Sequence, residues 1–168
     1  EALLATPLRS QLETVSPNEA GWEELAASAP ALVGQLSDLL LSAREPVEVR
    51  LRAAQLLGAV PTRRAAAALD EALQAPDLMI RRTASLALGA ICLASPSLTP
   101  PKERLTELAK QELMRPVGTS FPRRSYDRQS AFMYDARGNE ISPTLELVFN
   151  ILAIAGNAEE LQLALHAI

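Results

Sequence analysis

The chain has very few of the residues that build metal sites, disulfides and nucleophilic active sites. Its 168 residues include one cysteine, Cys92, and one histidine, His166. A single cysteine excludes an internal disulfide, and one His with one Cys is too few for an ordinary zinc site. A nucleophilic triad would have to use His166, and nothing in the sequence places its partners. We therefore expect no metal, no cofactor and no enzymatic activity.

Aromatic residues, excess positive charge and long apolar runs are also scarce. Aromatics make up 4% of a chain that is 48% hydrophobic, so Ala and Leu carry the apolar weight, which favours packed helices over sheets. No run of about 18 apolar residues occurs, and no membrane span is expected. The net charge of −4 gives no overall basic field, so we expect no nucleic-acid binding.

The chain begins at Glu1, without an initiator methionine or a recognisable signal peptide. A removed leader and a fragment of a longer protein would both give this start. We therefore expect a soluble protein, either cytoplasmic or extracytoplasmic after removal of a leader.

The clearest positive feature is a stretch that occurs twice, 31 residues apart. It reads VRLRAAQLLGAV at 49–60 and IRRTASLALGAI at 80–91. Apolar residues recur at helical spacing in both copies, and the glycine near the end of each, Gly58 or Gly89, suits a helix terminus. A second apolar-periodic stretch follows each copy, so the unit is a pair of helices. Repeated helix pairs predict a stacked α-solenoid.

The pattern Val/Ile-Arg-x-x-Ala…Leu-Gly-x-Val/Ile resembles the short HEAT-like repeats of bacterial proteins, of the PBS-lyase type. The resemblance implies an all-α fold, a right-handed α-α superhelix of about four helix pairs. It also implies structural roles between repeats for Arg50, Arg81 and Asp77, because such residues tend to bond adjacent repeats in this family. Its members include scaffolds and bilin-attaching lyases, and related α-solenoids include DNA-alkylpurine glycosylases. The repeat residues themselves encode none of these activities.

We predict one domain over residues 1–168, in which helix pairs follow one another along the chain. The first pair is divergent, as end repeats commonly are. In the last pair, residues 157–168 are the returning helix. The predicted segments are a first pair over 22–43, a second pair over 46–74, a third pair over 77–114, an insert over 115–142 and a last pair over 143–168.

The insert over 115–142 has no helical stripe and is the strongest candidate for a binding site. It contains five arginines against three acids. Residues 132–141 are predicted to form a hairpin around a Gly-containing turn. Arg and Tyr are frequent in binding hot spots. The candidate partner-binding residues are Arg123, Arg124, Tyr126, Arg128, Phe132, Tyr134 and Arg137.

We therefore predict a non-catalytic scaffold or adaptor that binds another protein, expected to be acidic, through the concave helix face and the insert. The insert has three open interpretations: it binds the partner, its aromatic residues fold back over the helices, or it is disordered. The alternatives for the whole chain are a regulatory subunit or bilin-lyase-like protein and, third, a lipid- or peptide-binding groove. Cys92 is predicted to be a buried structural thiol.

Overall fold

A computed structural model describes residues 8–15, 17, 20–115 and 143–156 of the chain. Within these residues the structure contains α-helices, one 3-10 helix and no β-strand, which confirms the all-α prediction. The elements are α1 (Leu8–Thr14), α2 (Ala20–Leu41), α3 (Val47–Gly58), α4 (Arg63–Ala72), α5 (Leu78–Ala94), η2 (Pro96–Leu98), α6 (Lys102–Met114) and α7 (Pro143–Ile154).

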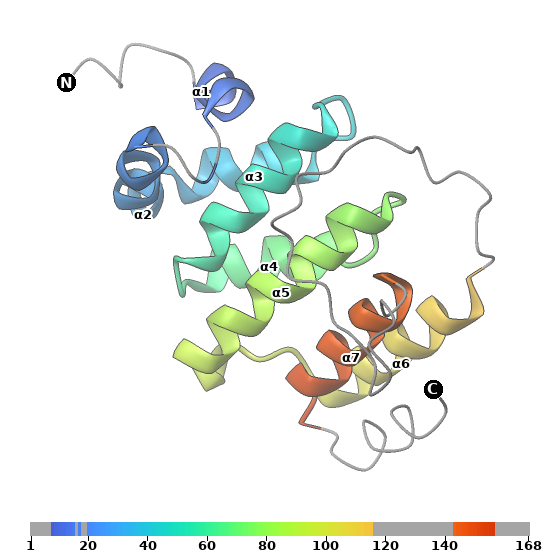
Figure 1. The fold of residues 1–168 in the computed structure, drawn as a ribbon. Coiled ribbons are helices and arrows are strands. Elements are labelled where there is room, and N and C mark those ends of the chain that lie inside the picture. Colours follow the sequence, from blue (N-terminus) through green and yellow to red (C-terminus); the bar gives the residue numbers. More distant parts are fainter. Residues whose placement is uncertain (1–7, 16, 18–19, 116–142, 157–168) are drawn as a thin grey trace, which may run out of the picture.

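The helices are stacked in two layers, from α1 and α2 at one end to α6 and α7 at the other (Figure 1). In the first layer α1 contacts α3, α3 contacts α5, and α5 contacts α7. In the second layer α2 contacts α4, and Arg104 of α6 forms an ion pair with Asp70 of α4. The layers meet where α2 packs on α3 and α4 packs on α5. This is the solenoid-like packing that the repeat predicts.

The two copies of the repeated stretch bury equivalent residues. Helices that share an apolar spacing turn the same face toward the core, so equivalent positions are expected to be buried alike. Each of the following pairs is fully buried: Val49 with Ile80, Ala53 with Ala84, and Leu57 with Leu88.

The two glycines of the repeat differ in their roles. Gly58 is the last residue of α3, but Gly89 lies inside α5, so the prediction of a helix terminus at Gly89 is wrong. A Cβ atom at Gly58 would lie 2.9 Å from the Cβ of Ala87 and 3.0 Å from its Cα. The missing side chain therefore lets α3 approach α5 closely.

The predicted pair over 22–43 is instead one helix, α2, with Pro30 inside it. Proline removes one intrahelical hydrogen bond, at a cost of about 3 kcal/mol. Pro30 lies on the exposed side, and a single buried stripe passes it without a change of phase. The stripe consists of Leu25, Ala29, Val33, Leu36 and Leu40. Burial of this stripe outweighs the proline, and the first pair of the stack is α1 with α2.

Helix α1 is joined to the start of the repeats by polar contacts. The Nε of Arg9 donates to Glu45 at 2.7 Å, and its Nη2 lies 2.9 Å from Glu13. The hydrogen bond to Glu45, followed by the charges of Glu13 and Glu45, raises the pKa of the exposed Arg9 guanidinium above its ordinary value. Arg52 of α3 donates to the carbonyl oxygen of Leu12. These contacts hold α1 beside α3.

Candidate protein-interaction surface

The arginine that follows the first apolar residue of each repeat is buried and bonds to backbone carbonyls. In the first copy, the Nε of Arg50 donates to the carbonyl oxygen of Leu40 at 2.8 Å. Leu40 lies in the last turn of α2, where carbonyls lack intrahelical donors. Arg50 therefore ties α3 to the end of the preceding helix.

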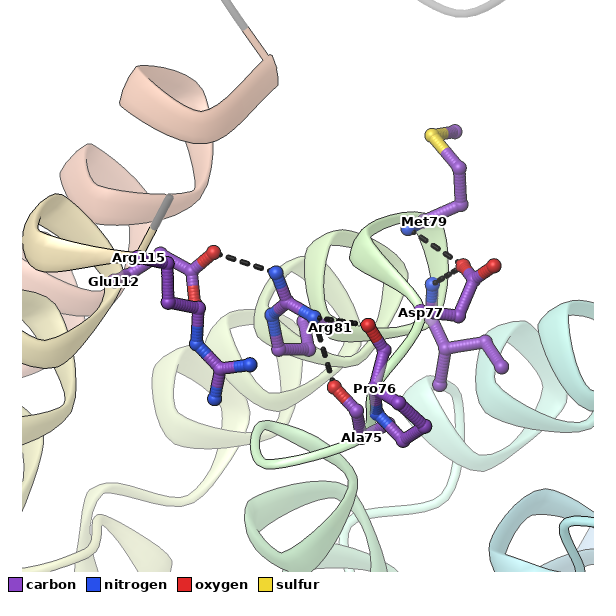
Figure 2. Close-up of polar contacts among 8 residues, drawn as sticks. Ala75, Pro76, Asp77, Met79, Arg81, Glu112 and Arg115 are labelled. Atoms are coloured by element: carbon purple, nitrogen blue, oxygen red, sulfur yellow. Dashed lines mark hydrogen bonds and ion pairs between the residues drawn. The ribbon is translucent and has the colours of Figure 1, made fainter. Parts of the chain in front are cut away.

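Arg81, in the second copy, is the centre of a larger buried network (Figure 2). Its Nη1 donates to the carbonyls of Ala75 and Pro76, both at 2.8 Å. Its Nη2 donates to Glu112 Oε1 of α6 at 2.6 Å, and the other carboxylate oxygen of Glu112 lies 3.1 Å from Nε of Arg115. The Nε of Arg81 is buried with no hydrogen-bond partner among the described residues. The network joins α5, the loop before it and α6.

The contacts of Asp77 lie within its own helix. Its Oδ1 accepts hydrogen bonds from the backbone N–H groups of Met79 at 2.8 Å and Ile80 at 3.1 Å (Figure 2). These groups have no intrahelical acceptor, so the carboxylate caps α5 and stabilises its N-terminus.

A second buried ion pair fixes α7 on α5. The guanidinium of Arg82 donates from Nε to Glu146 Oε2 at 2.7 Å and from Nη2 to Oε1 at 2.8 Å, and both side chains are buried. One turn further along, the amide of Asn150 donates to Ser85 Oγ at 3.4 Å. Sequence analysis missed this pair. The available signal was a second consecutive arginine that the first copy of the repeat does not have.

The buried charges of the described residues therefore hold helices together. Cys92 is also buried. No group of three or more His, Cys, Asp or Glu side chains in the described ranges could hold a metal ion. None of the helices in this part of the chain is long and apolar enough to cross a membrane.

The most unusual surface is the solvent-facing side of α5, which we call the outer face of α5. It is formed by Met79, Thr83, Leu86, Ala90 and Leu93. Leu86 is 47% exposed and Leu93 is 87% exposed. The two charged residues of α5, Arg81 and Arg82, are both buried in ion pairs, so this face carries no charge.

The equivalent side of α3 shows that the repeat does not require an apolar outer face. In the first copy of the repeat, 31 residues earlier, Glu48 is equivalent to Met79, Arg52 to Thr83 and Gln55 to Leu86. Both Glu48 and Gln55 are exposed. Leu86 and Leu93 are therefore not explained by the stack itself, and exposed apolar residues in one row are typical of interaction sites. Sequence analysis did not single them out, although this comparison could have done so.

A second exposed apolar site lies at the end of α6. Leu113 is 56% exposed and Met114 is 84% exposed. The insert over 115–142 begins directly after this end. Apart from Arg115, it lies outside the described residues, together with its predicted hairpin and the seven candidate residues between Arg123 and Arg137.

Residues 34–113 match the family model of HEAT repeats. This part of the chain therefore consists of HEAT repeats, and the predicted resemblance is confirmed. HEAT repeats generally mediate protein–protein interaction, and their families are typically non-catalytic scaffolds. No curated protein and no solved structure gave a significant match to the chain.

Proposed function

We propose that the chain is a non-catalytic scaffold or adaptor module that binds a helical segment of a partner protein on the outer face of α5. The main support is the contrast between α5 and α3. On the same side of the same repeat unit, α3 has the charged Glu48 and the polar Gln55, whereas α5 has the apolar Met79 and Leu86. Apolar residues that the fold leaves in solvent gain stability when a partner covers them.

The spacing of this face fits a helix. Leu86, Ala90 and Leu93 follow the spacing i, i+4 and i+7 and extend over about 10 Å along the helix axis. The small residue Ala90 between the leucines would let a partner helix approach closely. Full burial of each leucine contributes about 1.5–3 kcal/mol. The expected partner segment is an amphipathic helix with apolar residues at i, i+3 or i+4, and i+7.

The predicted concave helix face and the insert remain part of this proposal. The insert follows α6 and precedes α7, two helices that contact each other. Its excess of arginine favours an acidic partner segment, because guanidinium groups bind carboxylates with two hydrogen bonds. We propose that this acidic segment contacts the candidate residues of the insert, which include Arg123, Arg124 and Tyr126.

Site-specific photo-crosslinking tests the α5 site. A photoreactive residue at Leu86, introduced into the full chain in its native cells, is expected to capture the partner, whereas the same residue at Gln55 is not. With the purified partner, Leu86→Glu and Leu93→Glu are each expected to weaken binding at least tenfold, because a charge would be buried against an apolar surface. The control Gln55→Glu is expected to leave affinity unchanged. Equal effects at Leu86 and Gln55 would contradict the α5 site.

A separate variant tests the insert. Deletion of residues 118–140 is expected to weaken partner binding and to reduce its salt dependence, since screened charge pairs are lost. If the deletion lowers stability and leaves affinity intact, the insert covers the helices and does not bind the partner.

A further inference from the structure

Four residues on the outer face of α5 have the spacing by which two helices pack side by side. Thr83, Leu86, Ala90 and Leu93 follow one another at intervals of three, four and three residues, and we call them the α5 seam. Alternating intervals of three and four keep residues on one side of a helix and are typical of helix pairs. Both leucines of the seam are exposed. The seam extends over about 15 Å along the helix axis.

The α5 seam is complementary to itself when one copy is reversed. Its intervals are the same in both directions, but its small residues and its leucines exchange places. Two antiparallel copies therefore place Leu86 against Ala90 of the second copy, and Leu93 against Thr83 of the second copy. Every leucine then meets a small residue, which is the arrangement that fills the space between two closely packed helices. Two parallel copies in the same register would place leucine against leucine.

No charge opposes the approach of two such faces. A two-fold pair brings identical surfaces together, so a charge near the axis would lie close to its own copy. The two charged residues of α5, Arg81 and Arg82, are buried in ion pairs. The first copy of the repeat does not offer the same seam, because Arg52 and Gln55 occupy the positions of Thr83 and Leu86. Within the repeat, self-complementarity therefore belongs to α5.

We propose that, in the absence of a partner, two copies of the chain pair through the α5 seam in an antiparallel arrangement with two-fold symmetry. Helix α5 has the pattern that the proposed function expects of a partner helix, since its apolar residues Leu86, Ala90 and Leu93 occur at i, i+4 and i+7. One helix from each copy forms a small interface, so the dimer is weak and dissociates readily. A partner helix binds by displacing the second copy.

Sedimentation equilibrium of the full chain over a range of concentrations tests the pairing. We expect a reversible equilibrium between monomer and dimer. Leu86→Glu is expected to weaken it at least tenfold, because each dimer would bury the new charge twice. Leu93→Glu, at a position that is 87% exposed in the single copy, is expected to do the same without loss of folding.

The matched control is Gln55→Glu, which places the same charge at the equivalent position of α3. It is expected to leave the equilibrium unchanged. Equal weakening by Leu86→Glu and Gln55→Glu would overturn the proposal. A chain that stays monomeric up to about 1 mM, the weak end of specific association, would also overturn it.

Disulfide trapping tests the antiparallel orientation. One protein carries Leu86→Cys and another carries Ala90→Cys, both with the buried Cys92 replaced by alanine, and the mixture is treated with oxidised glutathione. The disulfide between the two proteins is expected to exceed the proportion that random coupling gives, because positions 86 and 90 oppose each other only in the antiparallel pair. Random proportions, or an excess of the two homodimers, would overturn the proposal.

These results can be told apart from those of the proposed function. Capture of another protein from Leu86 by a chain that stays monomeric would overturn the self-pairing and leave the partner site intact. Pairing of copies without capture of another protein would support the self-pairing and contradict the partner site. The displacement alone rests on the proposed function: affinity for the purified partner is expected to fall as chain concentration rises, and binding of the partner to the intact dimer would overturn it.

Discussion

Arg82 and Glu146 are joined by two parallel hydrogen bonds, at 2.7 and 2.8 Å, although 64 residues separate them in the sequence. Both side chains are buried, so neither charge is solvated by water. Removing water from two charges is costly, and the gain comes from their mutual attraction in a fixed geometry. The pair therefore defines where α7 lies on α5 more than it adds net stability.

This ion pair predicts an asymmetry between single and double variants. Glu146→Leu leaves a buried guanidinium without its partner and is expected to lower the free energy of unfolding by about 3–5 kcal/mol. The double variant Arg82→Met/Glu146→Leu is expected to recover most of that loss, because it places apolar groups in an apolar interface. Denaturant unfolding of the three proteins measures both values. Additive losses in the double variant would mean that the pair is not coupled.

The glycines of the repeat predict changes of opposite sign. Gly58→Ala places a Cβ atom 2.9 Å from the Cβ of Ala87 and is expected to destabilise the protein by about 1–3 kcal/mol, because α3 and α5 must separate. Gly89→Ala places it 3.6 Å from Ile154, an ordinary contact inside a helix, and is expected to stabilise by about 0.5–1 kcal/mol. Thermal and denaturant unfolding check both, and the same sign for both would contradict the close approach at Gly58.

The cap of α5 predicts how Asp77 tolerates substitution. Asp77→Ala is expected to lower stability by about 0.5–2 kcal/mol, because two N–H groups lose their acceptor. Asp77→Asn keeps an acceptor oxygen and is expected to stay within a few tenths of a kcal/mol of the unmodified protein. A loss with Asn as large as that with Ala would indicate that the charge of Asp77 makes a contact beyond its own helix.

The two repeated arginines are predicted to differ in sensitivity. Arg81 donates to two carbonyls and to Glu112, whereas the Nε of Arg50 donates to one carbonyl. Lysine has a single donor group and cannot reproduce the planar geometry of arginine. Arg81→Lys is therefore expected to cost about 2–3 kcal/mol and Arg50→Lys about 1 kcal/mol. Equal losses in denaturant unfolding would show that the Arg81 network adds nothing beyond one backbone contact.

The outer face of α5 predicts variants that leave the fold intact. Leu86→Gln and Leu93→Gln replace exposed apolar side chains, and each is expected to change the free energy of unfolding by no more than about 0.5 kcal/mol. Calorimetry of the isolated protein measures this, with the buried Leu88→Gln as the contrasting variant. Marked destabilisation by Leu86→Gln would show that this residue belongs to the core and does not form part of a partner site.

Much of the stack could be predicted because it depends on local spacing. The positions of Val49 and Ile80, one repeat apart, identified the buried face of α3 and of α5. The end of α6 at Met114 coincides with the end of the predicted third pair over 77–114. The segment 22–43, predicted as a helix pair, contains Pro30, and a proline ordinarily ends a helix. The phase of Leu25, Ala29 and Val33 across it was the better guide.

The non-local contacts could not be predicted in the same way. The pairing of Arg82 with Glu146 depends on how far α7 is displaced along α5. Similar apolar residues at helical spacing allow several displacements of one helix along the other, and the sequence does not select among them. The network of Arg81 likewise needs Glu112, an acid in a buried position of α6, which periodicity alone assigns to an apolar residue.

The ion pair of Arg82 also limits how the chain can be divided. The HEAT-repeat match ends at residue 113, and a fragment truncated there would still contain the whole matched segment. Such a fragment would lose Glu146. The guanidinium of Arg82 would have no carboxylate partner, and the side of α5 that α7 covers would be exposed. Residues 143–156 are therefore as necessary to the integrity of the matched segment as its own helices, and transplanting that segment between proteins would require an acidic substitute for Glu146.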